Sequence, residues 1–225
     1  MRSDRRDFLK QLGLATAAVG GAMVTPLDAA TLERAGDALA RSDGAWDMSW
    51  VEAVQRAPYK AVFDSPALAD GAALDLAAGI LDDFTAVYGQ DAGFRPVIVM
   101  RQLGQVMAFG DALWDRYGIG AERQVNDPLT KQPARRNPYA KAVAGDPAWA
   151  VAAKLETLRA RGAIFLVCNR ASMNWAERAA ERTHTNVDSV RAAVRAGLVP
   201  GATLMPTGVF ALVRAQNAGC AFMRG

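Results

Sequence analysis

The sequence predicts an α/β domain in which five mainly parallel strands form one sheet with helices on both faces. Five short apolar segments alternate with longer segments whose apolar residues recur at helical spacing. Strands separated by helices of about ten residues or more pair in parallel, because the helix carries the chain back along the sheet. Two of the apolar segments, residues 96–100 and 163–168, are uninterrupted, as in strands buried on both faces.

Length and composition fit one globular domain with a short appendage. The chain has 225 residues, of which 51% are hydrophobic and 22% are charged, and this composition excludes wholesale disorder. Two cysteines are too few for a disulfide scaffold, and two cysteines with one histidine argue against a common zinc site. The net charge of +3 is spread along the chain, so the sequence does not predict a nucleic-acid-binding protein.

The first 30 residues have the layout of an export signal. Residues 5–10 (RRDFLK) resemble the twin-arginine motif, and a thirteen-residue apolar stretch, 12–24, follows them. As a helix this stretch rises about 20 Å, which is too short to cross the roughly 30 Å core of a bilayer. We therefore predict a signal peptide at residues 1–30, cleaved between Ala29 and Thr31, that directs the chain through the twin-arginine translocase to the periplasm. A retained anchor and a retained amphipathic helix are the alternatives.

Residues 31–57 are predicted to form a helical lead-in to the domain. Trp46, Trp50 and Val54 recur four residues apart and therefore share one face of a helix. Pro58 ends this helix, because proline lacks the backbone N–H that a helix interior needs. We expect the helix to pack on the domain that follows.

The domain itself, residues 58–225, contains the predicted strands and helices in alternation. The strands are predicted at residues 59–63, 96–100, 163–168, 203–205 and 220–223, the last one at an edge of the sheet. The helices are predicted at residues 70–88, 105–117, 148–161, 171–182, 187–196 and 208–218. In parallel sheets of this kind, ligands and reactive groups collect at the carboxyl ends of the strands.

Cys168 is the candidate nucleophile. It ends the apolar strand at 163–168 and directly precedes a helix. The free N–H groups and the dipole at a helix N-terminus stabilise a thiolate, which is the nucleophilic form of cysteine. Asn169 and Arg170 follow it, and the charge of Arg170 would add to this stabilisation. The alternative is a buried cysteine that behaves as a small hydrophobic residue.

The segment from residue 59 to residue 223 resembles the DsrE/DsrF-like sulfur-relay family. The likeness is carried by residues 60–64, 97–100, 162–168, 199–206 and 209–219. The resemblance implies a flavodoxin-like sheet, assembly into trimers or hexamers, and a strand-end cysteine that accepts sulfur as a persulfide. Cys168 falls on that position and would be the sulfur-accepting residue. Many members carry a His-Gly pair after the second strand, where this chain has Arg101 and Gln102.

Three further side chains are candidates for assisting the cysteine. His184, the single histidine, lies in a polar link between two predicted helices and could carry a proton or pair with the thiolate. A solvated or capping role is the alternative. Arg135 and Arg136 lie in a basic, proline-containing loop and could clamp a sulfur oxyanion, because the arginine fork matches such groups. A solvated charged loop is the alternative.

The remaining motifs point away from other functions. Cys220 starts its strand whereas Cys168 ends its own, so parallel pairing would place the two at opposite edges, too far apart for a disulfide, whereas an antiparallel last strand would leave the pairing open. We therefore expect Cys220 to be a packing residue. The sequence has no phosphate loop, dinucleotide fingerprint or Gly-x-Ser-x-Gly motif, and it predicts no bound cofactor.

The sequence thus predicts an exported, oligomeric, DsrE-like protein that accepts and transfers sulfane sulfur on Cys168. Its partners would be a sulfur donor or acceptor protein. The alternative is a non-catalytic periplasmic binding or assembly protein, also oligomeric, in which Cys168 only packs.

Overall fold

A computed structural model describes residues 46–89 and 93–225. The predicted signal peptide at 1–30, its cleavage site and residues 31–45 of the lead-in lie outside the described residues. Within the described part of the chain, no helix has the length and apolar character needed to cross a membrane.

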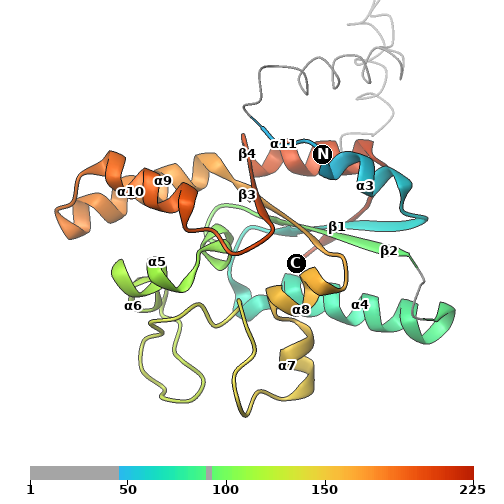
Figure 1. Cartoon of the computed structure of the whole chain (residues 1–225), viewed down its shortest axis with the longest axis horizontal. Helices are drawn as coiled ribbons and strands as arrows, with labels where there is room; N and C mark the ends of the chain where they lie inside the picture. Colours follow the sequence, from blue (N-terminus) through green and yellow to red (C-terminus); the bar gives the residue numbers. More distant parts are fainter. Residues whose placement is uncertain (1–45, 90–92) are drawn as a thin grey trace, which may run out of the picture. The chain divides into compact units, whose positions relative to one another are not determined.

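A five-stranded parallel sheet forms the centre of the domain and confirms the predicted fold class (Figure 1). The strands are β1 (Tyr59–Ser65), β2 (Phe94–Met100), β3 (Ile164–Cys168), β4 (Ala202–Met205) and β5 (Ala221–Arg224). They lie in the order β4-β3-β2-β1-β5, and every neighbouring pair is parallel. The carboxyl ends of all five strands therefore meet at one edge, which we call the carboxyl edge.

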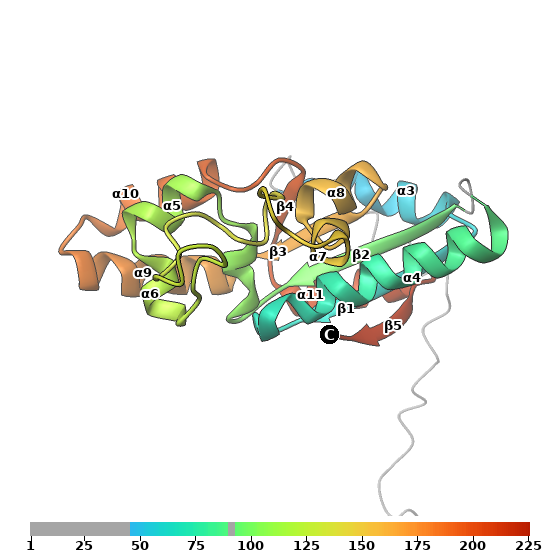
Figure 2. The same ribbon diagram turned by 90° about the horizontal axis from the view of Figure 1, so that it is seen from below.

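Nine α-helices and two 3₁₀ turns precede or connect the strands within the described residues. They are α3 (Trp50–Arg56), η2 (Ala69–Gly71), α4 (Ala72–Tyr88), η3 (Gly104–Ala108), α5 (Asp111–Arg116), α6 (Ile119–Arg123), α7 (Ala148–Ala152), α8 (Leu155–Ala160), α9 (Asn169–Thr183), α10 (Val187–Ala196) and α11 (Gly208–Asn217). Helices α4, α7 and α8 cover one face of the sheet, and α3 and α11 cover the other (Figures 1 and 2).

Two hydrophobic clusters hold these helices to the sheet. Successive side chains of a strand point to opposite faces, so neighbouring residues of β1 enter different clusters. Phe63 packs with α4 and α8, whereas Val62 packs with α3 and α11. Because β2 and β3 are buried on both faces, their segments 96–100 and 164–168 are continuously apolar rather than alternating.

A third cluster lies beyond the carboxyl edge, where α5, α6, α9 and α10 gather (Figure 2). Its centre is Trp175 of α9, which is fully buried. The indole ring meets the rings of Phe109 and Tyr117 at centroid distances of 5.0 and 5.6 Å. Its Nε1–H donates to Glu122 at 2.9 Å. These contacts fix the direction in which α9 leaves the sheet.

Two predicted helices are interrupted in the structure. The helix expected at 105–117 is a 3₁₀ turn and then α5, because Phe109 bridges Leu198 and the Gly110 N–H donates to Gly197 at 2.7 Å. The helix expected at 148–161 is α7 and α8. It breaks because the N–H groups of Leu155 and Glu156 donate to carbonyls of residues 139 and 140 instead of continuing the helix.

The predicted lead-in helix begins later than its periodicity indicates. It starts at Trp50 rather than at Trp46, and it ends before Pro58 as expected. Trp50 and Val54 are buried against the sheet, so the predicted packing face is confirmed for these two residues.

Candidate functional site

Cys168 stands at the junction of β3 and α9. Its Sγ accepts a hydrogen bond from the backbone N–H of Ala171 at 3.4 Å, so the sulfur itself caps the helix. The residue is 7% exposed. The sulfur atom thus faces the N-terminal, positive end of the dipole of a 15-residue helix.

A pocket of about 610 Å³ opens beside Cys168 at the carboxyl edge. It is lined by the segment after β2, the first turns of α9 and the start of α11, which contribute Arg101, Gln102, Leu103, Arg170, Ala171, Asn174, Arg178, Thr207, Gly208 and Val209. Three of these residues are arginines, and none is acidic. The pocket therefore has the charge that would attract an anionic ligand to the cysteine.

Arg101 is held in place by a two-pronged ion pair with Asp64. The arginine Nε and Nη2 donate to the two carboxylate oxygens, both at 2.7 Å. These hydrogen bonds raise the pKa of Arg101 above its ordinary value, burial opposes the rise, and the charge of Asp64 adds to it. Gly208 leaves the room that Arg101 needs, because a Cβ there would lie 2.5 Å from the Cβ of Arg101.

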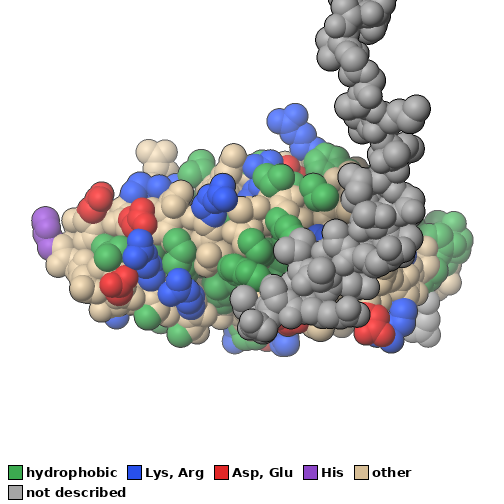
Figure 3. All heavy atoms as spheres, turned by 90° about the horizontal axis from the view of Figure 1, so that it is seen from above, with side chains coloured by type: hydrophobic (Ala, Val, Ile, Leu, Met, Phe, Trp, Pro, Cys, Tyr) green, Lys and Arg blue, Asp and Glu red, His purple; other side chains and the backbone are tan. Residues whose placement is uncertain are grey.

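Helix α9 supplies the other two arginines. Residues 170, 174 and 178 are spaced by four and therefore share one face of the helix, which borders the pocket. Neither Arg170 nor Arg178 pairs with a carboxylate of the described residues. Figure 3 shows the side of the molecule that carries α3 and α11, where basic side chains (blue) lie between apolar ones (green). The guanidinium groups of Arg170 and Arg178 therefore remain available to an incoming anion.

The structure separates one predicted assistant from Cys168. Asn169 is the first residue of α9 and Arg170 lines the pocket, as their sequence positions imply. His184 caps the opposite end of α9, and a helix of 15 residues is about 22 Å long. The contact between His184 and the thiolate that the sequence left open therefore does not form. His184 adopts a left-handed backbone (φ 50°) that ends the helix.

Arg135 and Arg136 do not line the cysteine pocket. Both are exposed, and Arg135 pairs with Asp115 at 2.5 Å. The arginines that do line it include Arg101 and Arg178, which sequence analysis did not single out as ligands. A signal was present for both. Arg101 follows β2 directly at the edge where Cys168 lies, and Arg178 is two helical turns beyond Arg170.

Comparison with known proteins does not assign this site. No family model matches the sequence. No curated protein matches it either. A similar solved structure is that of a protein of unknown function from Methanobacterium thermoautotrophicum, with 16% sequence identity and a TM-score of 0.38. The match covers 74% of this chain and 99% of that one. The function must therefore be argued from the residues of the pocket.

The second cysteine is a packing residue, as expected. Cys168 and Cys220 are both free thiols. Cys220 precedes β5 at the amino edge of the sheet, and two strands separate β5 from β3. Burial raises the pKa of the Cys220 thiol to about 11. In the described part of the chain, no three His, Cys, Asp or Glu side chains gather to hold a metal.

We expect Cys220 of the folded protein to resist iodoacetamide at neutral pH. The thiolate is the reactive form, and the thiol of Cys220 gives up its proton only near its raised pKa of about 11. This pKa is higher in the folded protein than in the unfolded chain. The contribution of the protonated Cys220 thiol to the free energy of unfolding is therefore complete below the unfolded pKa and is lost as the pH rises toward 11. Peptide mass mapping after alkylation measures the labelling of Cys220, with the urea-unfolded chain as the control. Equal labelling of Cys220 in folded and unfolded protein would contradict the prediction.

Proposed function

We propose that this protein accepts sulfane sulfur on Cys168 as a persulfide and passes it to an acceptor thiol. One observation carries the proposal. The Sγ of Cys168 caps the N-terminus of α9 inside a pocket whose charged lining residues are all arginines. A helix N-terminus activates the sulfur, and arginines bind the oxygen atoms of a sulfur oxyanion. The resemblance of residues 59–223 to sulfur-relay proteins supports the same activity.

The reaction balances without an oxidant or a reductant. The Cys168 thiolate attacks the outer sulfur of a thiosulfate-like donor, and a new sulfur–sulfur bond forms as the donor's own breaks. Sulfite leaves with the electron pair of that bond, and the Cys168 persulfide keeps a negative charge. An acceptor thiolate then attacks the outer sulfur of the persulfide, and Cys168 is released as the thiolate. Both steps keep an anion next to the N-terminus of α9 and the arginines.

Intact-mass measurement tests the proposal. Purified protein incubated with thiosulfate or polysulfide should gain about 32 Da per sulfur atom, and dithiothreitol should remove the gain. Alkylation before the incubation should prevent it. If no reducible gain appears and Cys168 also resists alkylation in the folded state, the sulfur-transfer proposal fails.

Removing two of the pocket arginines should slow the reaction with an anionic donor. For Arg170→Gln/Arg178→Gln we expect a loss on the order of tenfold in the rate with thiosulfate, since two exposed ionic contacts contribute about 0.5–1 kcal/mol each. The rate with neutral iodoacetamide should fall less. Arg135→Gln/Arg136→Gln removes the same charge outside the pocket and is the matched control. An equal loss in both double variants would show that only overall charge matters.

A second function has one observation in its favour. Cys168 is only 7% exposed, which suits a packing role in a non-catalytic binding or assembly protein. This function predicts that Cys168→Ser leaves cellular function unchanged. The sulfur-transfer proposal predicts its loss.

We also propose that the protein is exported by the twin-arginine route and acts in the periplasm as a homo-oligomer. The support is the RRDFLK run with its apolar stretch and the resemblance to a family that forms trimers or hexamers. N-terminal sequencing of periplasmic protein should find a chain that starts at residue 30 or 31. Arg5→Lys/Arg6→Lys should leave the precursor in the cytoplasm. Light scattering of the purified protein measures the oligomer.

A further inference from the structure

We infer that a second pocket, on the α4 side of the domain, binds a small organic ammonium ion. The pocket has a volume of about 380 Å³ and lies between the start of α4, the loop at residues 124–128 and the segment at 138–154. It shares no lining residue with the Cys168 pocket. This inference is therefore independent of the sulfur-transfer proposal.

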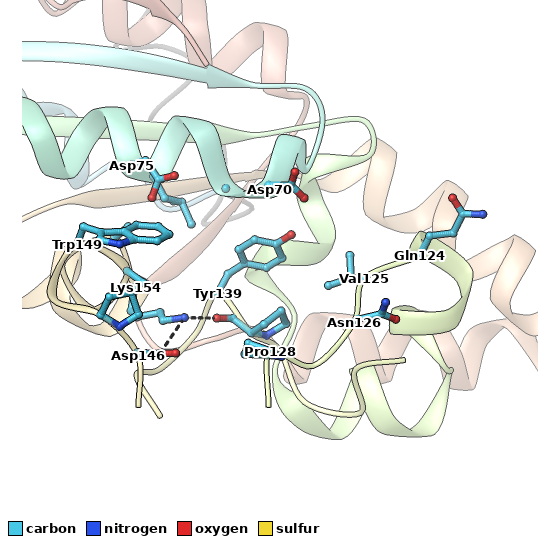
Figure 4. Close-up of a pocket in the computed structure, with 16 residues that line it drawn as sticks. Asp70, Asp75, Gln124, Val125, Asn126, Pro128, Tyr139, Asp146, Trp149 and Lys154 are labelled. Carbon is cyan, nitrogen blue, oxygen red and sulfur yellow. Dashed lines mark hydrogen bonds and ion pairs between the residues drawn. The ribbon is translucent and has the colours of Figure 1, made fainter. Parts of the chain in front are cut away.

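The charges that line this pocket are predominantly negative. They are three carboxylates, Asp70, Asp75 and Asp146, and one ammonium group, that of Lys154. Lys154 is already engaged: its Nζ donates to the Pro138 carbonyl at 2.7 Å and pairs with Asp146 at 3.2 Å (Figure 4). Asp70 and Asp75 form no ion pair with a basic side chain of the described residues. Both carboxylates are therefore without a basic partner among the described residues.

Aromatic side chains form the wall opposite these two carboxylates. Figure 4 shows Asp70 and Asp75 on the α4 side of the pocket and Trp149 and Tyr139 on the facing side. Trp149 is 68% exposed, although tryptophan is a residue that proteins usually bury. The face of an indole ring attracts an ammonium group through its quadrupole. A carboxylate and an aromatic face together are the usual environment of a bound organic cation.

The rest of the lining excludes other ligand classes. Leu74, Val125, Pro128, Ala150 and Ala153 make much of the surface apolar, so the ligand needs an apolar body next to its charge. An anion would be repelled by the excess of carboxylates. A bare metal ion would find no set of three ligating side chains in the described residues.

The backbone fixes Asp70 in the pocket rather than leaving it on a loose turn. Ala69, Asp70 and Gly71 have successive φ values of 40°, 53° and 91°. Gly71 packs against Tyr139, since a Cβ at this glycine would lie 3.4 Å from the ring. Burial raises the pKa of Asp75, and the charge of Lys154 opposes the rise.

Isothermal titration calorimetry with phenethylammonium chloride tests the inference. The matched neutral compound is 2-phenylethanol, which has the same ring and chain without the charge. We expect binding of the ammonium compound and at least about tenfold weaker binding of the alcohol. Equal affinity for the two compounds, or no heat from the ammonium compound at millimolar concentration, would overturn the inference.

Two variants locate the binding. Asp75→Asn should weaken the affinity for phenethylammonium by about tenfold, because it removes a carboxylate from the pocket wall. Asp83→Asn makes the same change on the same helix at an exposed residue outside the pocket and should leave the affinity unchanged. An equal effect of both variants would place the ligand elsewhere. Both sites are exposed, and circular dichroism checks that the variants fold.

Discussion

Cys168→Ser is expected to abolish the reducible mass gain after incubation with thiosulfate. A serine hydroxyl does not ionise near neutral pH and forms no persulfide, so the loss should be complete rather than partial. The same variant should keep the fold, because serine is close to cysteine in size and its hydroxyl can cap α9 in place of the sulfur. Thermal unfolding of both proteins verifies that only the chemistry has changed.

The second cysteine provides the control for this variant. Cys220→Ser should retain the full mass gain, because Cys220 lies at the opposite edge of the sheet with a pKa of about 11. A persulfide that persists in Cys168→Ser and disappears in Cys220→Ser would show that Cys220, and not Cys168, accepts the sulfur. The proposed pocket would then lose its role.

Trp175→Ala is expected to cause the largest loss of stability among single substitutions beyond the carboxyl edge. The side chain is fully buried between Phe109 and Tyr117, and it bonds Glu122 through its ring nitrogen. Replacing a buried tryptophan by alanine costs about 3–5 kcal/mol, because it leaves a cavity and removes apolar surface whose burial stabilises the folded state. Urea denaturation followed by circular dichroism measures the change in the free energy of unfolding.

Trp149→Ala is the matched control for this loss. Trp149 is 68% exposed, so its removal should change the free energy of unfolding by no more than about 0.5 kcal/mol. Similar destabilisation by the two substitutions would mean that the cluster around Trp175 does not hold α9 to the rest of the domain.

The strands were predictable from the sequence because burial on both faces leaves a local mark. Residues 96–100 and 163–168 contain no polar residue up to their last position, and both segments are central strands. The interrupted helices were not predictable. Phe109 and Gly110 leave helical geometry to pair with residues 197 and 198, which are remote in the sequence. Periodicity reports a helix wherever apolar residues recur at the right spacing, and it does not detect a distant backbone partner.

The candidate site shows the same limit. The place of Cys168 follows from the order of strand and helix, which is local information. Which of the basic residues line the pocket does not follow from local information. Arg135 and Arg136 belong to the more strongly basic segment, yet the arginines that reach the pocket are set by strand order and by the pair between Arg101 and Asp64, 37 residues apart. Arg178 reaches it only because α9 is a continuous helix from Cys168 onward.

The hydrogen bond between the start of α9 and the Sγ of Cys168 couples this end of the helix to any sulfur bound on the cysteine. In the structure the N–H of Ala171 donates a hydrogen bond to the Sγ atom of Cys168. In the persulfide that we propose, the negative charge would lie on the outer sulfur, and the inner sulfur would be a weaker acceptor than a thiolate. The first turn of α9 would then be less firmly anchored when sulfur is bound. A delivery partner that senses the start of this helix could tell a loaded carrier from an empty one without touching the sulfur.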